Sequence, residues 1–400
     1  MPSIVLISTG SPATNPRLVK EANALHTAGY RVHVLYSHVI DWAEEIDAAI
    51  LKKAPWSAEL IGGGPSENIL TFRVSSWSFK FMRRIRSLNI RATRLTRTSH
   101  ALSKAARQHK ADLFIAHNLG ALPAAVIGAQ CHKARAAFDA EDYHYGEFPA
   151  NTWEATLTKH VEDKWIPKCA ATWSASPLIS HAYRKRFSNH AFDVVDNVFP
   201  LSQRAPRTED DAGVLRMMWF SQTIGEGRGL EPFFNALQVQ KKGAWSLTLI
   251  GRLSPSFEGT LQEFQKHFPN QVHTLPPMKE KDLFKEMGKH DIGLALEMGT
   301  PLNRDLCRTN KLFSFILNGC YLCMTNTQAQ TEFMAKHPSC GSMVPLESPA
   351  SWPTVIGELI DNREKVTQGK QSNWTLGESH LNWEVEQEKL LTLVKNALET

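Results

Sequence analysis

Short apolar runs alternate with amphipathic segments along almost the whole chain, which is the pattern of a parallel α/β sheet. The apolar runs are short and rich in β-branched residues, so they predict strands that are buried on both faces. In the first half we expect strands at residues 3–8, 32–36, 112–116, 136–139 and 170–174. In the second half we expect strands at residues 215–220, 246–250, 272–275, 292–296 and 321–324.

Helices are predicted between these strands, where apolar residues recur at a spacing of three or four. Leu18, Ala22 and Leu25 share such a face, and Gly29 ends the segment. We expect further helices at residues 121–130, 229–237, 260–267, 280–287 and 310–317, and a long amphipathic helix at 383–398.

The alternation is interrupted once, between residues 196 and 213, by a polar segment that contains Pro200 and Pro206 and has no period. We therefore predict two doubly wound, Rossmann-like α/β domains that face a cleft. Their expected bounds are 1–198 for the first domain, 199–212 for the linker, 213–378 for the second domain, and 379–400 for a C-terminal helix that packs back toward the first domain. Ligands of such sheets bind at the carboxyl ends of the strands.

Size and composition fit this interpretation. A chain of 400 residues is too long for one ordinary core, and 21% charged residues are typical of a soluble globular protein. No apolar run approaches the roughly 20 residues that span a bilayer. The amino terminus reads as a first strand, because it has no basic leader or cleavage site. Cys320 and Cys323 lie in an apolar stretch, which favours inert core thiols over a metal or redox pair. We expect a cytoplasmic protein.

A glycine-rich turn follows the predicted strand that ends at Phe220. Gly225, Gly227, Arg228 and Gly229 come just before an expected helix. The free N–H groups at such a helix start favour an anionic ligand, and an arginine adds a fork of donors that matches phosphate. The alternative interpretation is a simple turn with a solvated surface arginine.

Other motifs follow in an order and spacing that resemble a known family. They are the opening loop and helix at 15–34, the segments at 116–118 and 139–142, the strand at 196–198, the turn at 225–229, the strand at 291–296, Asn303, and the blocks at 308–315 and 318–319. Together they resemble the family 4 glycosyltransferases of the GT-B fold. Each motif is weak alone, and the likeness runs in order through nearly all of the chain.

The resemblance implies transfer of a sugar from a nucleoside diphosphate, UDP- or GDP-linked, usually with retention and without a metal or other cofactor. It implies that Arg228 holds the diphosphate, that Asn310 and Lys311 approach the phosphates or the sugar, and that His117 faces the reacting centre. The full expected donor-binding set is Gly225, Gly227, Arg228, Gly229, Glu297, Asn303, Asn310, Lys311 and Ser314, and the expected acceptor-binding set is Asn15, Arg17 and Lys20.

The chemistry of sugar transfer explains these residue types. Negative charge grows on the departing diphosphate, and cations and N–H dipoles must stabilise it. Glu141 and Asp142 follow a strand at the same expected edge as His117, and either carboxylate is a candidate to accept the proton of an acceptor hydroxyl. The alternatives are a histidine satisfied within a loop and carboxylates that cap a helix or lie in a solvated turn.

Two departures from the family pattern leave a second hypothesis open. Ser314 stands where the family usually has a glutamate that holds the ribose, and Gln222 stands where a basic residue is common. A GT-B-like protein that binds a nucleotide or glycan without transferring sugar is therefore the rival. A nicotinamide-dependent oxidoreductase is disfavoured, because no G-x-G-x-x-G follows the first strand and no acidic residue ends the second.

Basic residues gather where acidic ones are missing, between Glu67 and Asp112. Seven apolar residues there recur at helical spacing, and arginines cover the opposite face from Arg83 to Arg97. One interpretation is a helix that docks on an anionic membrane near a lipid-linked acceptor. The other is a core helix with solvated arginines. Nucleic acid is not an expected partner, because no binding motif accompanies the charge. We expect the protein in the cytosol or on the inner face of the cell membrane.

Overall fold

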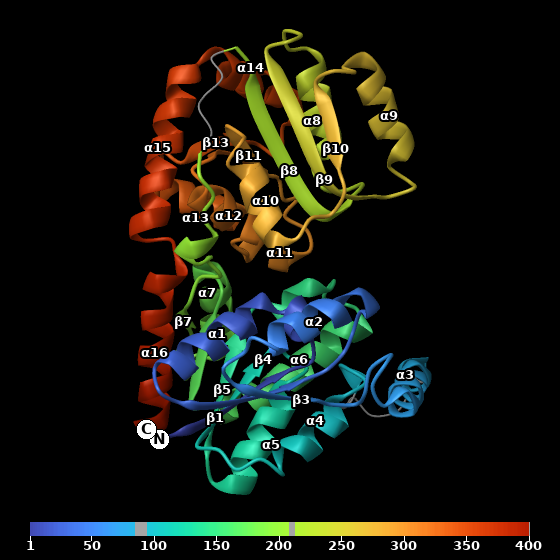
Figure 1. Cartoon of the computed structure of the whole chain (residues 1–400), viewed down its shortest axis with the longest axis vertical. Helices are drawn as coiled ribbons and strands as arrows, with labels where there is room; N and C mark the ends of the chain where they lie inside the picture. Colours follow the sequence, from blue (N-terminus) through green and yellow to red (C-terminus); the bar gives the residue numbers. More distant parts are fainter. Residues whose placement is uncertain (85–93, 208–212, 400) are drawn as a thin grey trace. The chain divides into compact units, whose positions relative to one another are not determined.

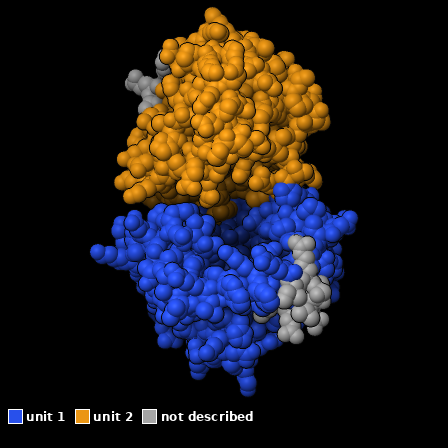
Figure 2. Space-filling view, turned by 90° about the vertical axis from the view of Figure 1, so that its right-hand side faces the viewer, with its two compact units in different colours: residues 1–196, 301–303, 387–400 blue, residues 197–300, 304–386 orange. Residues whose placement is uncertain are grey.

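The computed structural model describes residues 1–84, 94–207 and 213–399, and it divides into two compact units (Figures 1 and 2). Unit 1 comprises residues 1–196, 301–303 and 387–400, and unit 2 comprises residues 197–300 and 304–386. The first boundary falls inside the polar segment that interrupts the sequence pattern. Residues 208–212 of the predicted linker lie outside the described residues.

Unit 1 is built on seven parallel strands in the order β3-β2-β1-β4-β5-β6-β7. The strands are β1 (Ser3–Ser8), β2 (Arg31–Tyr36), β3 (Ser57–Leu60), β4 (Leu113–His117), β5 (Arg135–Ala140), β6 (Ala171–Ser174) and β7 (Asp193–Val194). The central strands are buried on both faces, which is why they read as unbroken apolar runs. The strand order reverses between β1 and β4, and this point is where doubly wound sheets bind ligands.

The helices of unit 1 connect successive strands. They are α1 (Pro16–Thr27), α2 (Glu44–Leu51), α3 (Ile69–Arg84), α4 (Ser99–Ala106), α5 (Leu122–His132), α6 (Trp153–Trp165) and α7 (Pro177–Arg186). The start of α1 is fixed by Asn15, whose side chain accepts the Leu18 N–H, and by Pro16 at the first helical position. Leu18, Ala22 and Leu25 are buried, as their spacing predicts.

Unit 2 repeats this architecture with six parallel strands in the order β10-β9-β8-β11-β12-β13. The strands are β8 (Leu215–Ile224), β9 (Trp245–Leu253), β10 (Val272–Leu275), β11 (Ile292–Ala295), β12 (Tyr321–Thr325) and β13 (Gly341–Val344). The helices are α8 (Leu230–Gln238), α9 (Glu258–His267), α10 (Glu280–Met287), α11 (Leu302–Leu306), α12 (Asn310–Leu317), α13 (Gln328–Lys336), α14 (Trp352–Asp361), α15 (Arg363–Ser379) and α16 (Trp383–Glu399). The prediction of two Rossmann-like, doubly wound α/β domains is confirmed.

Strand β8 runs four residues beyond its expected end at Phe220. After an irregularity in the register, Thr223 and Ile224 pair again with the end of β9. The glycine-rich turn therefore begins directly at the end of the strand, at Gly225.

The segment that follows the unit boundary packs on unit 2 over its described part. The guanidinium of Arg204 lies 3.6 Å from the ring centroid of Trp374 and donates to the Leu317 carbonyl. The Ala205 N–H donates to the Asn318 side chain. At the other end of the chain, α16 begins in unit 2, and its residues from 387 onward belong to unit 1.

The basic segment differs from its prediction as one long amphipathic helix. Helix α3 is described as far as Arg84, and residues 85–93, including Arg86 and Arg91, lie outside the described residues. Residues 95–98 are not helical, and α4 begins only at Ser99. Arg94 is buried, and Arg97 is a structural residue that donates to the carbonyls of Gly62, His38 and Gly63 at 2.7–3.0 Å. Gly62 and Gly63 both have positive φ, which turns their carbonyls toward this guanidinium. The expectation of solvated arginines is therefore wrong at these two positions.

Two smaller expectations concern the cysteines and membrane-spanning helices. Cys320 and Cys323 are buried, and burial raises the pKa of each thiol to about 12, so both are inert at neutral pH. Within the described ranges, no helix combines the length and apolar character that crossing a bilayer requires.

Candidate functional site

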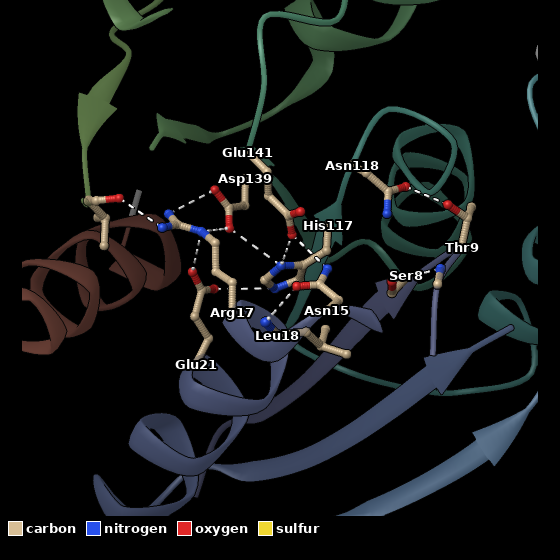
Figure 3. A network of polar contacts seen from close by, with 12 residues as sticks. Ser8, Thr9, Asn15, Arg17, Leu18, Glu21, His117, Asn118, Asp139 and Glu141 are labelled. Carbon is tan, nitrogen blue, oxygen red and sulfur yellow. Dashed lines mark hydrogen bonds and ion pairs between the residues drawn. The ribbon is translucent and has the colours of Figure 1, made fainter. Parts of the chain in front are cut away.

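A network of charged side chains is buried at the carboxyl edge of the unit 1 sheet (Figure 3). The strand register places it there, because Ser8 of β1 pairs with His117 of β4, and His117 pairs with Asp139 of β5. Helix α1 contributes Arg17 and Glu21 one turn apart. These positions flank the point where the strand order reverses.

His117 is at the centre of the network and is fully buried. Its Nδ1 lies 3.1 Å from the Glu141 Oε1 and 3.4 Å from the Asp139 Oδ2, and its Nε2 lies 3.3 Å from the Glu21 Oε2. Both ring nitrogens therefore face carboxylates, which is an arrangement that suits an imidazolium.

Arg17 closes the network from the other side and is only 2% exposed. Its Nε and Nη2 donate to the two carboxylate oxygens of Asp139 at 2.5 and 3.0 Å, and its Nη1 donates to the Val195 carbonyl at 2.9 Å. Its Nε also lies 3.5 Å from Glu21. The expected acceptor-binding arginine is thus committed to internal partners.

Opposing effects set the protonation of these groups. Burial lowers the pKa of His117, but Glu21, Glu141 and Asp139 raise it to a net value of about 10. Burial raises the pKa of Asp139 to about 7, although Arg17 opposes this. Burial also favours the neutral forms of Glu21 and Glu141, yet His117 and Arg17 hold both pKa values below the usual range. At neutral pH His117 is a cation between two carboxylates.

The edge of the network reaches solvent through Glu141, whose side chain is 22% exposed. Asn15 donates to the Glu141 Oε1 at 2.7 Å, so the loop before α1 orients this carboxylate. Lys20 lies on the same helix and is half-buried. The structure therefore brings Asn15, Arg17, His117 and Glu141 together.

Asp142 and Asn303 form a second contact in unit 1, to which residues 301–303 belong. The Asn303 amide donates to the Asp142 Oδ1 at 2.7 Å and accepts the Tyr143 N–H at 2.7 Å. Burial raises the pKa of Asp142, while His144 and Asn303 lower it. Asn303, expected among the donor-binding residues, lies here against the acidic loop.

In unit 2 the glycine-rich turn lies where the strand order reverses between β8 and β11. Gly229 has a φ of 76° and caps α8, and a Cβ there would lie 3.1 Å from the Leu296 Cβ. The turn therefore packs directly against the end of β11. The Gly227 N–H donates to the carboxylate of Glu231 at 3.2 Å, so one backbone donor of the turn already has an anionic partner within the chain.

Arg228 projects from this turn with its side chain half-exposed. Within the described part of the chain it makes no ion pair with a carboxylate. The turn thus presents a guanidinium, backbone donors and a helix start together, and this combination suits a phosphate or diphosphate.

Glu297 and Lys311 form an ion pair beside the turn. The Lys311 Nζ donates to the Glu297 Oε1 at 2.7 Å, and both side chains are about nine-tenths buried. The Thr325 hydroxyl accepts the Glu297 N–H and donates to the Glu297 carbonyl, which holds this stretch of backbone in place. Glu297 follows Leu296, so the pair lies next to the glycine-rich turn.

Asn310 and Ser314 lie on the same helix, α12, and have different environments. Asn310 is exposed, and its side-chain oxygen accepts from Asn197 at 2.9 Å. Ser314 is 1% exposed and donates to the Lys311 carbonyl one turn earlier. The Ser314 hydroxyl is therefore turned back on its own helix.

Sequence reasoning missed Glu21, the third carboxylate around His117. Its spacing of four from Arg17 is an available signal for an ion pair on one helix face. The spacing gives no indication that the pair faces the sheet, since that depends on strands more than 90 residues away.

No family model and no curated protein matches the chain in sequence. Solved structures do match over its full length. HepE from Anabaena, in complex with UDP-glucose, has a TM-score of 0.70 and 11% identity over 99% of this chain and 100% of that one. Sucrose-phosphate synthase from Thermosynechococcus elongatus has a TM-score of 0.72 and 13% identity over 100% of both chains. The lipopolysaccharide outer core galactosyltransferase WaaB, in its apo form, has a TM-score of 0.63 and 14% identity over 98% of this chain and 99% of that one.

These similarities show the fold, which is the GT-B fold of two Rossmann-like domains. At such low identities they do not carry an activity over to this chain.

Proposed function

We propose that this protein is a glycosyltransferase that moves a sugar from a nucleoside-diphosphate sugar to a glycan or lipid-linked acceptor, with retention and without an essential metal. The observation that carries this proposal is the turn after β8, where Arg228 has no carboxylate partner within the described residues and adjoins a helix start. The structural neighbour HepE is seen with UDP-glucose, and its TM-score supports an equivalent fold.

The groups of unit 2 supply what the leaving diphosphate needs. As the bond to the sugar breaks, negative charge grows on the diphosphate, and Arg228, Lys311 and the N–H groups of the turn stabilise it. Glu297 holds Lys311 in place and presents a carboxylate that accepts hydrogen bonds from sugar hydroxyls. Fixed donors of this kind need little rearrangement during the reaction.

The carboxylates of unit 1 supply the proton acceptor. Burial raises the pKa of Asp142, whereas the neighbouring His117 holds the pKa of Glu141 low. A base works best when its pKa approaches the working pH, so we assign the acceptor proton to Asp142. The role of Glu141 is then to orient the acceptor together with Asn15.

A binding assay with turnover tests the proposal. UDP, GDP and ADP are titrated into the full chain, with NAD as the comparison, and release of the nucleoside diphosphate is followed with each donor sugar. We expect one nucleoside diphosphate to bind and Arg228→Ala to weaken it at least tenfold. Lys241→Ala is the matched control, because this exposed cation lies in the loop before β9, at the opposite edge of the sheet. Unchanged affinity in Arg228→Ala, or binding of NAD alone, would overturn the proposal.

The buried hydroxyl of Ser314 favours a second candidate, a GT-B protein that binds a nucleotide or glycan without transferring sugar. In that case the nucleoside diphosphate binds as above, while no donor sugar is consumed with any acceptor. Ser314→Glu then tests whether the missing carboxylate limits binding, because tighter nucleotide binding in this variant would identify the ribose contact.

We further propose that α3 docks unit 1 on an anionic membrane near a lipid-linked acceptor. All side chains of α3 are at least partly exposed, and Leu70, Val74, Trp77 and Phe81 form one stripe at helical spacing with exposures of 52–76%. In Figure 1, α3 lies at the edge of its unit, apart from the helices that cover the sheet. Arg73, Lys80, Arg83 and Arg84 are the basic residues of the same helix. An apolar stripe with flanking cations is the pattern of an interfacial helix.

A pocket under α3 supports this placement of the acceptor. It has a volume of about 620 Å³ and lies at the carboxyl ends of β1 and β2. Phe72 and Phe79 give it an apolar lining, and Lys80 and Arg84 add positive charge. These groups suit an amphiphile that has a phosphate head and a hydrocarbon chain.

Flotation with vesicles tests the membrane proposal. We expect the chain to bind vesicles that contain anionic lipid at low salt and to be released at high salt, since each cation near the surface contributes about 1 kcal/mol. Trp77→Ser reduces binding, whereas Val239→Ser, an equally exposed apolar residue in unit 2, leaves it unchanged. Equal flotation of the two variants would refute the role of α3.

A further inference from the structure

Two histidines and a glutamate meet on one face of unit 1, away from the candidate site. His33 is near the amino end of β2 and pairs in register with Ser57 at the start of β3, so Glu59 lies diagonally across from it on the same face. His109 follows α4, which packs on β2. Three separate elements thus bring these side chains to one point.

The three side chains lie close enough together to share one metal ion. One potential donor atom from each of His33, Glu59 and His109 lies within 4.8 Å of the others. The His109 Nε2 is 2.9 Å from the Glu59 Oε2. The two imidazole rings are stacked, with centroids 4.4 Å apart and an interplanar angle of 22°.

The contacts of His33 leave its Nε2 atom open to a metal ion. Its Nδ1 lies 2.8 Å from the Ser57 Oγ, and that hydroxyl is oriented toward the Val32 carbonyl. From these contacts we assign Nδ1 as the donor to Ser57, which places the lone pair on Nε2. The Nε2 atom is buried and has no hydrogen-bond partner among the described residues, so its lone pair is unsatisfied there.

We propose that His33, Glu59 and His109 bind a divalent transition-metal ion of the zinc class. Two imidazole nitrogens and one carboxylate oxygen are a donor set that Zn²⁺ accepts, with water as the fourth ligand. Mg²⁺ and Ca²⁺ prefer oxygen ligands only and are poor candidates. Ser57 acts as the outer partner that fixes the His33 ring, as such partners do in metal sites.

A metal ion at this site cross-links the edge strand of the sheet to its neighbours. Strand β3 is at one edge of the sheet, where β2 is its neighbour in the strand order, and its residues Ser57–Leu60 are all half-buried or exposed. A bound ion connects β3 and the segment after α4 to β2. The effect is stabilising by mass action, because the unfolded chain does not hold the three ligands together. This site is independent of the proposed sugar transfer.

A second cluster, formed by Glu21, His117 and Asp139, also has ligand-like spacing. It is a poorer candidate, because the guanidinium of Arg17 already neutralises Asp139 at 2.5 Å. Substitutions at His109 and Glu59 distinguish the two clusters, because neither residue belongs to the second one.

The experiment uses the full chain after treatment with a chelator. Zn²⁺ is titrated by calorimetry, Tm is followed by differential scanning calorimetry, and Mg²⁺ at the same concentration is the comparison. We expect one Zn²⁺ per chain, a rise in Tm with Zn²⁺ and none with Mg²⁺. Co²⁺ gives the visible absorption of a four-coordinate site.

Variants assign the site. His109→Ala and Glu59→Gln should each weaken Zn²⁺ at least tenfold, and Glu59→Gln leaves folding intact because the side chain is exposed. His26→Ala, an exposed histidine on α1, should bind Zn²⁺ like the unaltered chain. Unchanged binding in both His109→Ala and Glu59→Gln, or no Zn²⁺ binding by the unaltered chain, overturns the proposal.

Discussion

Replacement of Arg17 by methionine tests whether the buried network holds unit 1 together. Methionine keeps most of the aliphatic chain and removes the guanidinium, which is 2% exposed and makes three hydrogen bonds to Asp139 and Val195. The change leaves two buried carboxylates without this cation. Removal of one partner from a buried ion pair costs about 3–5 kcal/mol, and we expect a loss of that size in the free energy of unfolding of unit 1.

Differential scanning calorimetry measures this loss. It resolves a separate unfolding transition for each of the two compact units, as is common for multi-domain proteins. For a unit of this size, 1 kcal/mol moves Tm by about 2–4 °C, so the unit 1 transition should fall by about 6–20 °C. The unit 2 transition should stay in place. Arg184→Met, an exposed arginine on α7, is the matched control and should move neither transition.

A double variant separates the ion pair from simple loss of packing. If charge pairing is the cause, Arg17→Met combined with Asp139→Asn destabilises by less than the sum of the single changes, with a coupling of about 0.5–3 kcal/mol. A fall of less than about 2–3 °C in the Tm of unit 1 in Arg17→Met would refute the reasoning. Strict additivity in the double variant would refute it as well.

Four further predictions concern single side chains. Asn15→Ala removes the cap of α1 and the donor to Glu141, so chemical denaturation should show that the free energy of unfolding falls by about 1–2 kcal/mol. The pKa of His117 is raised to about 10, so its stabilising effect is complete below pH 6.5 and is lost as the pH rises toward 10; His117→Gln should flatten this fall in Tm between pH 7 and 10, and an unchanged slope would contradict it. Gly229→Ala places an alanine at a positive φ with its Cβ 3.1 Å from the Leu296 Cβ. Thermal scanning should show that the free energy of unfolding of unit 2 falls by about 1–3 kcal/mol. Glu231→Gln frees the Gly227 N–H from a carboxylate, and calorimetry should show nucleoside diphosphate binding about 2–5-fold tighter, in line with charge effects of about 0.3–1 kcal/mol at a helix start.

Much of the fold is predictable because its strands are buried on both faces. Residues 4–7 and 113–116 are unbroken apolar runs, and each forms a central strand. Strand β3 escaped prediction because Ser57–Leu60 alternates polar and apolar residues at an exposed sheet edge. Periodicity was insufficient in the basic segment, where residues 95–98 interrupt the helical pattern, Leu102 and Ala106 are buried, and Phe81 is exposed. Helical spacing alone does not reveal whether a protein core or solvent faces an apolar stripe.

The candidate site was predictable only as far as strand ends determine it. His117 is the last residue of one strand and Glu141 comes directly after the neighbouring strand, so the topology alone brings them together. The commitment of Arg17 to Asp139 does not, since the pair is 122 residues apart and depends on how α1 packs on the sheet. The environment of Ser314 is likewise a property of packing, because its hydroxyl turns back on its own helix.

The division of α16 between the units means that no single cut separates them into two independent fragments. Leu390, Val394 and Ala397 are buried residues of unit 1, yet they lie near the far end of the chain. A fragment that stops at Asp196 lacks these side chains and exposes the apolar surface that they cover. Such a fragment should aggregate unless the last helix is fused to it, so domain-level expression of this protein calls for a rearranged chain order rather than truncation.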